Sequence, residues 1–196
     1  FFIPNKRSSY IFNSSIAGID ESDLCVIIGS DIRKEAPILG ARLRKKSMDK
    51  NMDYNVIRIG YQYDLSIEAL ELGKSFSSLT NLLNSKHSRL LNKSKKPIFI
   101  LGQGPLCSSE GENIFNFVLN LHNKVVKDSC WNGFNIIQNY SGRVGALDLE
   151  FFNKKNIKKN NIEDIYKGKY ETLYLFGADE LDFDKIPKKT FVIYHG

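Results

Sequence analysis

The segment at residues 23–46, DLCVIIGSDIRKEAPILGARLRKK, decides the fold. It opens with an uninterrupted apolar run, residues 24–28, which is typical of a parallel strand buried on both faces. A glycine turn follows, and then a helical pattern over 35–46 in which Pro37 suits the first turn and basic residues suit the last. Many α/β proteins hold a phosphate with such a strand–turn–helix unit, so the segment predicts an α/β fold and raises the question of a nucleotide.

The same unit recurs along the chain. Apolar runs predict further strands at 54–59, 97–101, 172–176 and 190–194, and apolar spacing predicts helices at 66–83 and 110–121. Four of the five predicted strands stop at a glycine, which indicates parallel α/β architecture. The polar, basic stretch at 84–96 is typical of a linker. We therefore predict two Rossmann-like parallel-sheet units, residues 1–96 with an N-terminal extension and residues 97–196 with an irregular segment at 131–161.

Composition and charge fit a globular protein. Of 196 residues, 42% are hydrophobic and 26% charged, and the formal net charge is +6. Part of the basic excess is local, in the lysine-rich run at 154–159, which could touch nucleic acid or anionic lipid. No aromatic residues alternate with these lysines, so we interpret the run as a solvated loop and predict no nucleic-acid partner. No apolar run approaches the roughly 18–20 residues of a membrane span, and no direct membrane span is expected.

The cysteines exclude an iron–sulfur cluster built by this chain alone. Cys25, Cys107 and Cys130 lie far apart, and no two have a C-x-x-C spacing. Such a cluster normally needs about four thiolates. Cys25 lies inside an apolar run and is predicted to be a small buried residue.

The glycine turns lack the chemistry of a dinucleotide site. A Rossmann fingerprint needs G-x-G-x-x-G and an acid after the second strand. The first turn offers Gly29 but no second glycine, and Asp31 would repel a phosphate. The second strand ends at Gly60 with no carboxylate, and the pair Gly102 and Gly104 has no third glycine at the required spacing. We predict that these glycines serve tight turns.

Other candidate groups are weaker. The histidines are isolated, and we interpret them as surface or hydrogen-bonded residues: His87, His122 and His195. A cluster of carboxylates could bind a cation, but a solvated turn is the favoured interpretation: Asp179, Glu180, Asp182 and Asp184. No catalytic, cofactor-binding or metal-ligating residue is therefore predicted.

Five segments of the chain resemble a known family, in the same order and at similar spacing. They are RSSYIFNSSIAGIDESDLCVIIGSDIRKEAPILGARLRKK, PIFILGQGPL, WNGFNIIQNYSGRVGALDLEF, LYLFGADELD and FVIYHG. They resemble the C-terminal part of the large iron–sulfur (75 kDa) subunit of respiratory complex I. That region is similar in turn to molybdopterin oxidoreductases, whose strand–turn–helix units hold a molybdopterin guanine dinucleotide. Those enzymes typically carry an Asp-Pro-Arg-like turn after the second strand, where this chain has Ile59, Gly60 and Tyr61.

The resemblance implies a structural, cofactor-free part of NADH:ubiquinone oxidoreductase. Such a part would brace, in the hydrophilic arm, the iron–sulfur domain that carries electrons from NADH to quinone, and would itself be non-catalytic. FMN and iron–sulfur clusters are then expected in partner chains. The partners would be other hydrophilic-arm subunits, including a separate cluster-bearing N-terminal part of the same subunit.

The expected location is the matrix side of the mitochondrial inner membrane, with the cytoplasmic side of a bacterial cytoplasmic membrane as the alternative. The heavy use of Asn, Lys, Ile and Phe favours an AT-rich organellar genome. The opening FFIPNKRSSY has no signal-peptide pattern.

Two other functions stay open from the residues. One is a fragment of an active molybdopterin oxidoreductase, such as a formate dehydrogenase, which predicts bound molybdenum or tungsten. The other is a free-standing nucleotide-binding module, which predicts affinity for NAD(H). We also hypothesise that the 131–152 segment makes a partner contact, because it is rich in aromatic side chains: Trp131, Phe134, Phe151 and Phe152.

Overall fold

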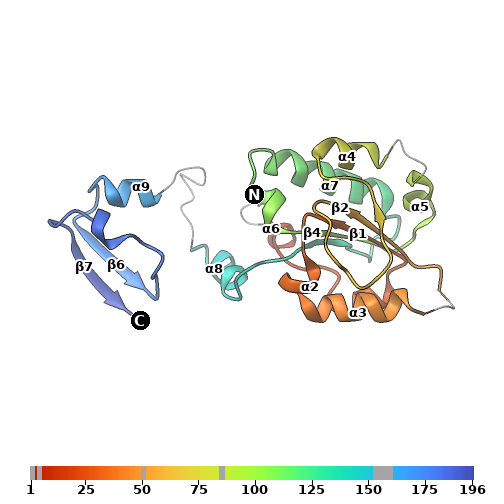
Figure 1. Cartoon of the computed structure of the whole chain (residues 1–196), viewed down its shortest axis with the longest axis horizontal. Coiled ribbons are helices and arrows are strands. Elements are labelled where there is room, and N and C mark those ends of the chain that lie inside the picture. Colours follow the sequence, from red (N-terminus) through yellow and green to blue (C-terminus); the bar gives the residue numbers. More distant parts are fainter. Residues whose placement is uncertain (1–2, 4–5, 50–51, 84–86, 152–160) are drawn as a thin grey trace. The chain divides into compact units, whose positions relative to one another are not determined.

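The structure, a computed structural model, describes the chain except residues 1–2, 4–5, 50–51, 84–86 and 152–160 (Figure 1). It contains two compact units, Phe1–Phe151 and Phe152–Gly196. The lysine-rich run at 154–159 lies outside the described residues. Within the described part, no helix is both long enough and apolar enough to cross a membrane.

The first unit is built on a five-stranded parallel sheet. Its strands are β1 (Leu24–Ile28), β2 (Asn55–Ile59), β3 (Leu70–Glu71), β4 (Pro97–Leu101) and β5 (Phe134–Ile136). Their order is β3-β2-β1-β4-β5, and each neighbouring pair is parallel. Every residue of β1 and β4 is buried, as the uninterrupted apolar runs predict. The predicted α/β fold with parallel sheets is confirmed.

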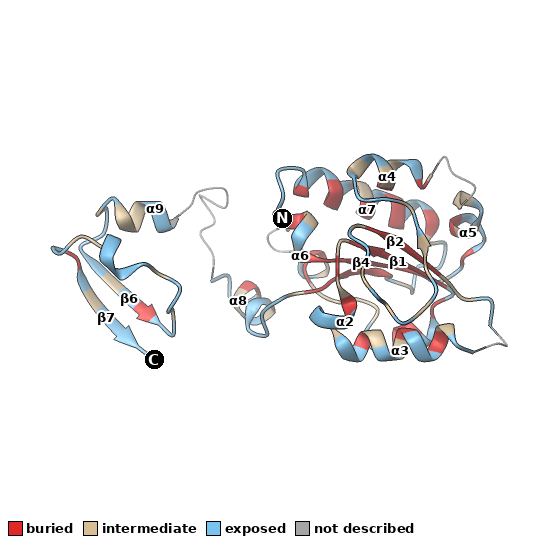
Figure 2. Ribbon diagram, viewed as in Figure 1, coloured by how far each residue is buried: buried red, intermediate tan, exposed pale blue. Residues whose placement is uncertain are grey.

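Helices cover both faces of this sheet, so alternate residues of β1 enter different cores (Figure 2). The first unit contains α1 (Gly18–Glu21), α2 (Ile32–Glu35), α3 (Pro37–Ser47), α4 (Phe76–Asn81), α5 (Ser88–Lys93), α6 (Gln103–Cys107), α7 (Gly111–Val125) and α8 (Arg143–Asp148), the last of which lies to one side of the sheet. Leu24, Val26 and Ile28 pack with side chains of α4, α5 and α7. Cys25 and Ile27 pack on the opposite face, with side chains of α3.

The predicted helix at 66–83 is wrong in its first half. Residues 70 and 71 form the edge strand β3, and α4 starts only at Phe76. Gly73 has a φ of +119°, which interrupts a helix, and the Ser75 side chain then caps α4 by accepting a hydrogen bond from the Ser78 N–H.

The structure places the division between the units later than the sequence suggests. The predicted boundary after residue 96 would assign β1 and β4 to different units. In the structure these two strands pair along their whole length, from Leu24–Pro97 to Ile28–Leu101. The polar stretch at 84–96 contains α5 and returns the chain to the same sheet. Residues 97–151 therefore belong to the first unit, because their strands complete its sheet.

The irregular segment at 131–161 contributes to this core. Phe134, in β5, is 2% exposed, and its ring meets Phe115 edge-on at 5.3 Å between centroids. The Trp131 indole N–H donates to the Pro97 carbonyl at 2.9 Å. Phe151 is 85% exposed, and Phe152 lies outside the described residues. The hypothesis of a partner contact is thus wrong for Phe134, which is a core residue.

The second unit contains α9 (Asn161–Tyr166) and two parallel strands, β6 (Thr172–Phe176) and β7 (Phe191–His195). Leu175 is buried, at 4% exposure. Side chains at alternate positions share a face of a sheet, and one face of this sheet carries exposed apolar residues. We call it the aromatic face: Tyr174, Phe176, Phe191 and Ile193.

Candidate functional site

The carboxyl ends of β1, β2 and β4 open onto a cavity of about 690 Å³. This volume falls within the roughly 300–1,000 Å³ of small-molecule sites. Open α/β sheets bind ligands at this edge, where the strand order reverses, and here the reversal lies between β1 and β4. The walls come from three turns, from α4 and from the start of α7.

Three glycine turns pack against one another at the edge of the sheet that borders this cavity. A Cβ atom on Gly102 would lie 2.3 Å from the Gly29 carbonyl oxygen, and one on Gly29 would lie 2.1 Å from Cγ of Pro105. Gly29 also has a φ of +56°, which side chains rarely allow. The geometry therefore gives these glycines a packing role, in line with the prediction from the sequence.

The amides of these turns continue the hydrogen bonding of the sheet. The Gly29 N–H donates to the Ile59 carbonyl at 2.8 Å, and the Gly102 N–H donates to the Ile28 carbonyl at 3.0 Å. The Gly60 N–H donates to the Gly73 carbonyl at 2.8 Å. These donors are thus engaged by the protein's own backbone.

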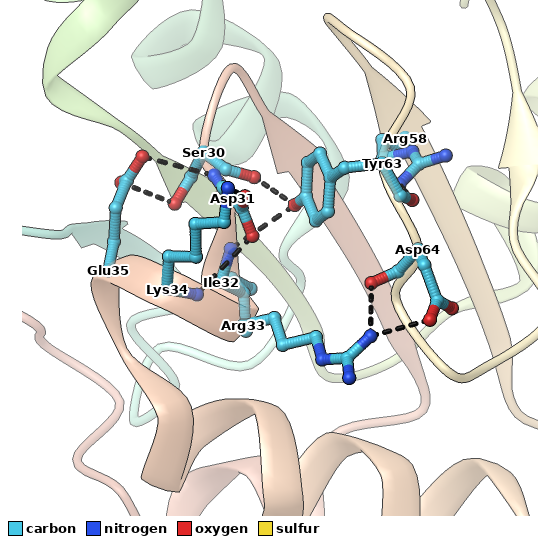
Figure 3. A network of polar contacts seen from close by, with 9 residues as sticks. All are labelled: Ser30, Asp31, Ile32, Arg33, Lys34, Glu35, Arg58, Tyr63 and Asp64. Carbon is cyan, nitrogen blue, oxygen red and sulfur yellow. Dashed lines mark hydrogen bonds and ion pairs between the residues drawn. The ribbon is translucent and has the colours of Figure 1, made fainter.

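The amides at the start of α2 are engaged by side chains (Figure 3). The Glu35 carboxylate accepts from the Asp31 N–H at 3.1 Å and from the Ser30 hydroxyl at 2.8 Å. The Ile32 N–H donates to the Tyr63 hydroxyl at 3.2 Å, and that hydroxyl donates to the Ser30 carbonyl. A phosphate bound at a strand–helix turn needs such N–H groups, and here acceptors of the chain itself hold them.

Arg58 supplies no free charge to the cavity. Its Nη2 lies 2.5 Å from one Glu71 carboxylate oxygen, and its Nε donates to the other at 3.0 Å. Its guanidinium carbon lies 4.6 Å from the centroid of the Tyr63 ring. Burial raises the pKa of the Tyr63 hydroxyl above its ordinary value, which keeps that group protonated as a donor.

A phosphate-bearing cofactor does not fit the described residues at this edge. Its anionic groups would meet the carboxylates of Asp31 and Glu35, and the amides of Asp31 and Ile32 are already bonded. The geometry brings together Asp31 with the turn glycines that the sequence singled out, Gly29, Gly60 and Gly104. Sequence reasoning missed three further residues, Glu35, Tyr63 and Pro105. Glu35 lies four residues after the cap Asp31, one residue beyond the spacing of a capping box, so its hydrogen bond to the Asp31 N–H had no standard signal in the sequence.

The other candidate groups lie outside this cavity. Asp182 pairs with Lys185 at 2.8 Å, and the Tyr194 hydroxyl donates to Asp179 at 2.5 Å. In the described part of the chain, no cluster of three or more His, Cys, Asp or Glu side chains could hold a metal ion. His122 is buried, and its Nε2 accepts from the Gly133 N–H at 3.0 Å.

His122 is expected to make stability fall as the pH drops below about 6.5. Burial lowers the pKa of His122 below its ordinary value of 6.5, so the folded chain keeps the ring neutral where the unfolded chain binds a proton. The contribution is fully present above pH 6.5 and is lost as the pH falls toward the folded pKa. Urea midpoints between pH 7.5 and 5.5 measure the slope. His122→Gln, which retains an acceptor and does not titrate, should flatten the slope, and an unchanged slope would contradict this account.

Gly102→Ala is expected to lower the free energy of unfolding by about 1–3 kcal/mol, because the new methyl group overlaps the Gly29 backbone. Gly145→Ala is the matched control. Gly145 lies within α8, has no atom within 4 Å of its added Cβ, and should gain up to about 1 kcal/mol from alanine's helix propensity. Urea denaturation of both variants checks the difference. Equal stability of the two would show that the two turns can move apart freely.

Comparison with known proteins identifies the family. The profile of the molybdopterin oxidoreductase family matches residues 2–196. The chain is 38% identical to the NADH-ubiquinone oxidoreductase 75 kDa subunit of Reclinomonas americana over 195 residues, which are 97% of this chain and 27% of that protein. It is 34% identical to the mitochondrial 78 kDa subunit of Candida albicans, and 33% identical to an NADH-quinone oxidoreductase subunit of Rickettsia bellii. These alignments cover 97% of this chain and 25% and 27% of the two relatives.

A solved structure with a similar fold is the formyltransferase/hydrolase complex of Methylorubrum extorquens in complex with methylofuran. The TM-score is 0.59 over 95% of this chain and 61% of that one, and at 11% identity the likeness concerns the fold alone. The chain spans about a quarter of the length of the curated relatives that it matches. The protein thus belongs to the molybdopterin oxidoreductase family, and its sequence is similar over nearly its whole length to the 75 and 78 kDa subunits of NADH-ubiquinone oxidoreductase.

Proposed function

We propose that this chain is a structural, cofactor-free part of the hydrophilic arm of an NADH:ubiquinone oxidoreductase. There it braces the domain whose iron–sulfur clusters carry electrons from NADH to quinone, and it performs no chemistry itself. The similarity to the 75 and 78 kDa subunits supports the assembly, and the cavity supports the lack of a cofactor.

One observation supports the cofactor-free assignment: acceptors of the chain itself hold two N–H groups that a bound phosphate would need. Glu35 and Tyr63 accept from the N–H groups of Asp31 and Ile32 at the first strand–helix turn. A phosphate would have to displace a carboxylate and would then lie close to Asp31. Both steps oppose binding, because like charges repel and the displaced carboxylate loses its hydrogen bonds to the Ser30 hydroxyl and the Asp31 N–H.

The cysteines support the location of the clusters on partner chains. Cys25 is completely buried among apolar side chains, while Cys107 and Cys130 are exposed and free. An iron–sulfur cluster normally needs about four thiolates, and this chain has three separate ones. FMN and the clusters would then belong to other chains, including a separate cluster-bearing N-terminal part of the same subunit.

The aromatic face supports a bracing role. Parallel sheets are normally covered on both faces, yet Phe176 is 74% exposed and Phe191 is 65% exposed. Burial of such side chains against a neighbour would stabilise the contact by about 1.5–3 kcal/mol each.

The proposed location is the matrix side of the mitochondrial inner membrane, since the Candida albicans relative is named as mitochondrial. The similarity to a Rickettsia bellii protein supports the alternative, the cytoplasmic side of a bacterial cytoplasmic membrane.

Native fractionation of the source membranes in mild detergent tests this function. The chain should run with the band that oxidises NADH, at one copy per flavin subunit, and mass spectrometry of that band should find the cluster-bearing part of the subunit. A small species that contains molybdenum or a nucleotide would contradict the proposal.

A charge on the aromatic face should weaken this assembly. Phe176→Lys is expected to reduce the amount of chain in the NADH-oxidising band several-fold, since a lysine would be buried without a partner. Tyr140→Lys is the control, because Tyr140 is similarly exposed, at 73%, and lies on the first unit. Equal incorporation of both variants would show that the aromatic face stays open in the complex.

The second candidate function is a fragment of an active molybdopterin oxidoreductase. The observation in its favour is the cavity of about 690 Å³ at the ligand-binding edge of the sheet. Elemental analysis of the purified complex distinguishes the two functions. One atom of molybdenum or tungsten per chain would favour the active oxidoreductase over the structural role.

A further inference from the structure

We propose that the cavity at the carboxyl ends of β1, β2 and β4 binds a small organic cation with an apolar body. The inference rests on the proposed function, in which no phosphate-bearing cofactor occupies this edge of the sheet. It assigns to the cavity a ligand of the opposite charge.

The floor of the cavity is apolar. Ile28 and Ile59, the last residues of β1 and β2, line it together with Leu79 of α4 and Ile114 of α7. All four are buried, with exposed fractions between 1% and 8%. A ligand with an aromatic or aliphatic body would cover these side chains, at roughly 25 cal/mol per Å² of apolar surface removed from water.

Three carboxylates line the same cavity: Asp31, Glu35 and Glu110. The Ser30 hydroxyl and the Asp31 N–H hold the Glu35 carboxylate in place at the first turn. Lys34 lies 3.7 Å from Asp31, but its side chain is 86% exposed, so water screens this pair. Ionised carboxylates next to an apolar floor favour a cation that offers N–H donors.

The basic residues of the wall do not cancel these carboxylates. Arg58 is engaged by both oxygens of Glu71, which lies outside the cavity lining. The Lys74 ammonium lies 5.2 Å from the centroid of the Tyr61 ring. With Arg58 paired, the lining has three carboxylates and one remaining basic group, Lys74. The cavity is therefore acidic, although the chain as a whole has a formal charge of +6.

Three aromatic rings also line the cavity. They belong to Tyr61, which is 80% exposed, to Tyr63 and to Phe76. Two of these rings already attract cations of the chain, Arg58 over Tyr63 and Lys74 over Tyr61. An organic cation gains from such rings through its charge and from the floor through its body.

Three probes of nearly equal shape test the proposal on the full chain: benzamidinium, neutral benzamide and anionic benzoate. Isothermal titration at low salt is expected to give a dissociation constant for benzamidinium about tenfold lower than for benzamide, and no binding of benzoate. Glu110→Gln should raise the dissociation constant of benzamidinium to nearly that of benzamide. The dissociation constant of benzamide should stay unchanged, which also shows that the variant is folded. Glu112→Gln, two residues further on at the second position of α7 and outside the cavity lining, should leave all three constants unchanged.

The outcomes separate the two proposals. Equal binding of benzamidinium and benzamide, or no binding of either probe at millimolar concentration, overturns the cation site and leaves the proposed function standing. Preferential binding of benzoate, or of ADP in a parallel titration, overturns both, because the strand–helix turns would then accept anions.

Discussion

Phe115→Ala is expected to lower the free energy of unfolding of the first unit by about 3–5 kcal/mol. Phe115, on α7, is completely buried and meets Phe134 of β5 edge-on, so its ring fills the space between helix and sheet. Truncation removes the apolar surface of the ring and leaves a cavity that the surrounding side chains fill only in part. Urea denaturation of wild type and variant measures the loss.

Phe151→Ala is the matched control, since it deletes the same ring at a position that is 85% exposed. Its stability should stay within about 0.5 kcal/mol of wild type. If both substitutions cost the same, α7 does not pack against the sheet as described.

Glu71→Ala is expected to cost about 3 kcal/mol, because it leaves the Arg58 guanidinium buried without its counter-charge. The Arg58 side chain is 8% exposed, and both carboxylate oxygens of Glu71 contact it. The loss of one partner of a buried pair is strongly destabilising, typically by about 3–5 kcal/mol. The 29% exposure of Glu71 lets water reach the site, which places the expected value at the lower end.

A double variant separates the cost of an unpaired charge from the contribution of the pair. Arg58→Met with Glu71→Leu removes both charges and keeps apolar bulk, so most of the lost stability should return. The comparison uses the free energies of unfolding of wild type, Glu71→Ala and the double variant. A double variant less stable than Glu71→Ala would show that the ion pair itself stabilises the fold.

The central strands could be predicted because one local property determines them. Residues 24–28 and 97–101 are apolar without interruption, and only a strand covered on both faces buries every side chain of such a run. Glycine after the strand marks the turn for an equally local reason, since Gly29 adopts a positive φ.

Elements that depend on distant partners could not be predicted. β5 has three residues, and its central Asn135 is fully buried because its amide donates to the Gly133 carbonyl and its oxygen accepts from the Ser14 N–H. The residues around Asn135 in the sequence give no sign that Ser14, 121 residues earlier, is its hydrogen-bond partner. The boundary at residue 96 failed for the same reason, because β4 joins the first sheet through pairing with β1, a strand far earlier in the chain.

The candidate site could be predicted only in part from the sequence. The sequence places Asp31 just after the first glycine turn, but it does not show which side chains hold the N–H groups there. Tyr63 reaches the Ile32 N–H from a loop 31 residues away, and Pro105 of α6 covers Gly29. Such contacts depend on the arrangement of three chain segments in space. Arg58, a charge inside an apolar strand, was the one sign that a buried partner had to exist.

Trp131 makes the two units spectroscopically distinguishable. It is the single tryptophan in the sequence, and its indole N–H is bonded to the Pro97 carbonyl in the first unit. Fluorescence excited near the red edge of indole absorption will therefore report the loosening of β4 and its neighbours in the first unit. Circular dichroism senses both sheets. The separation between the two melting curves would then measure how far the second unit can unfold while the first stays intact.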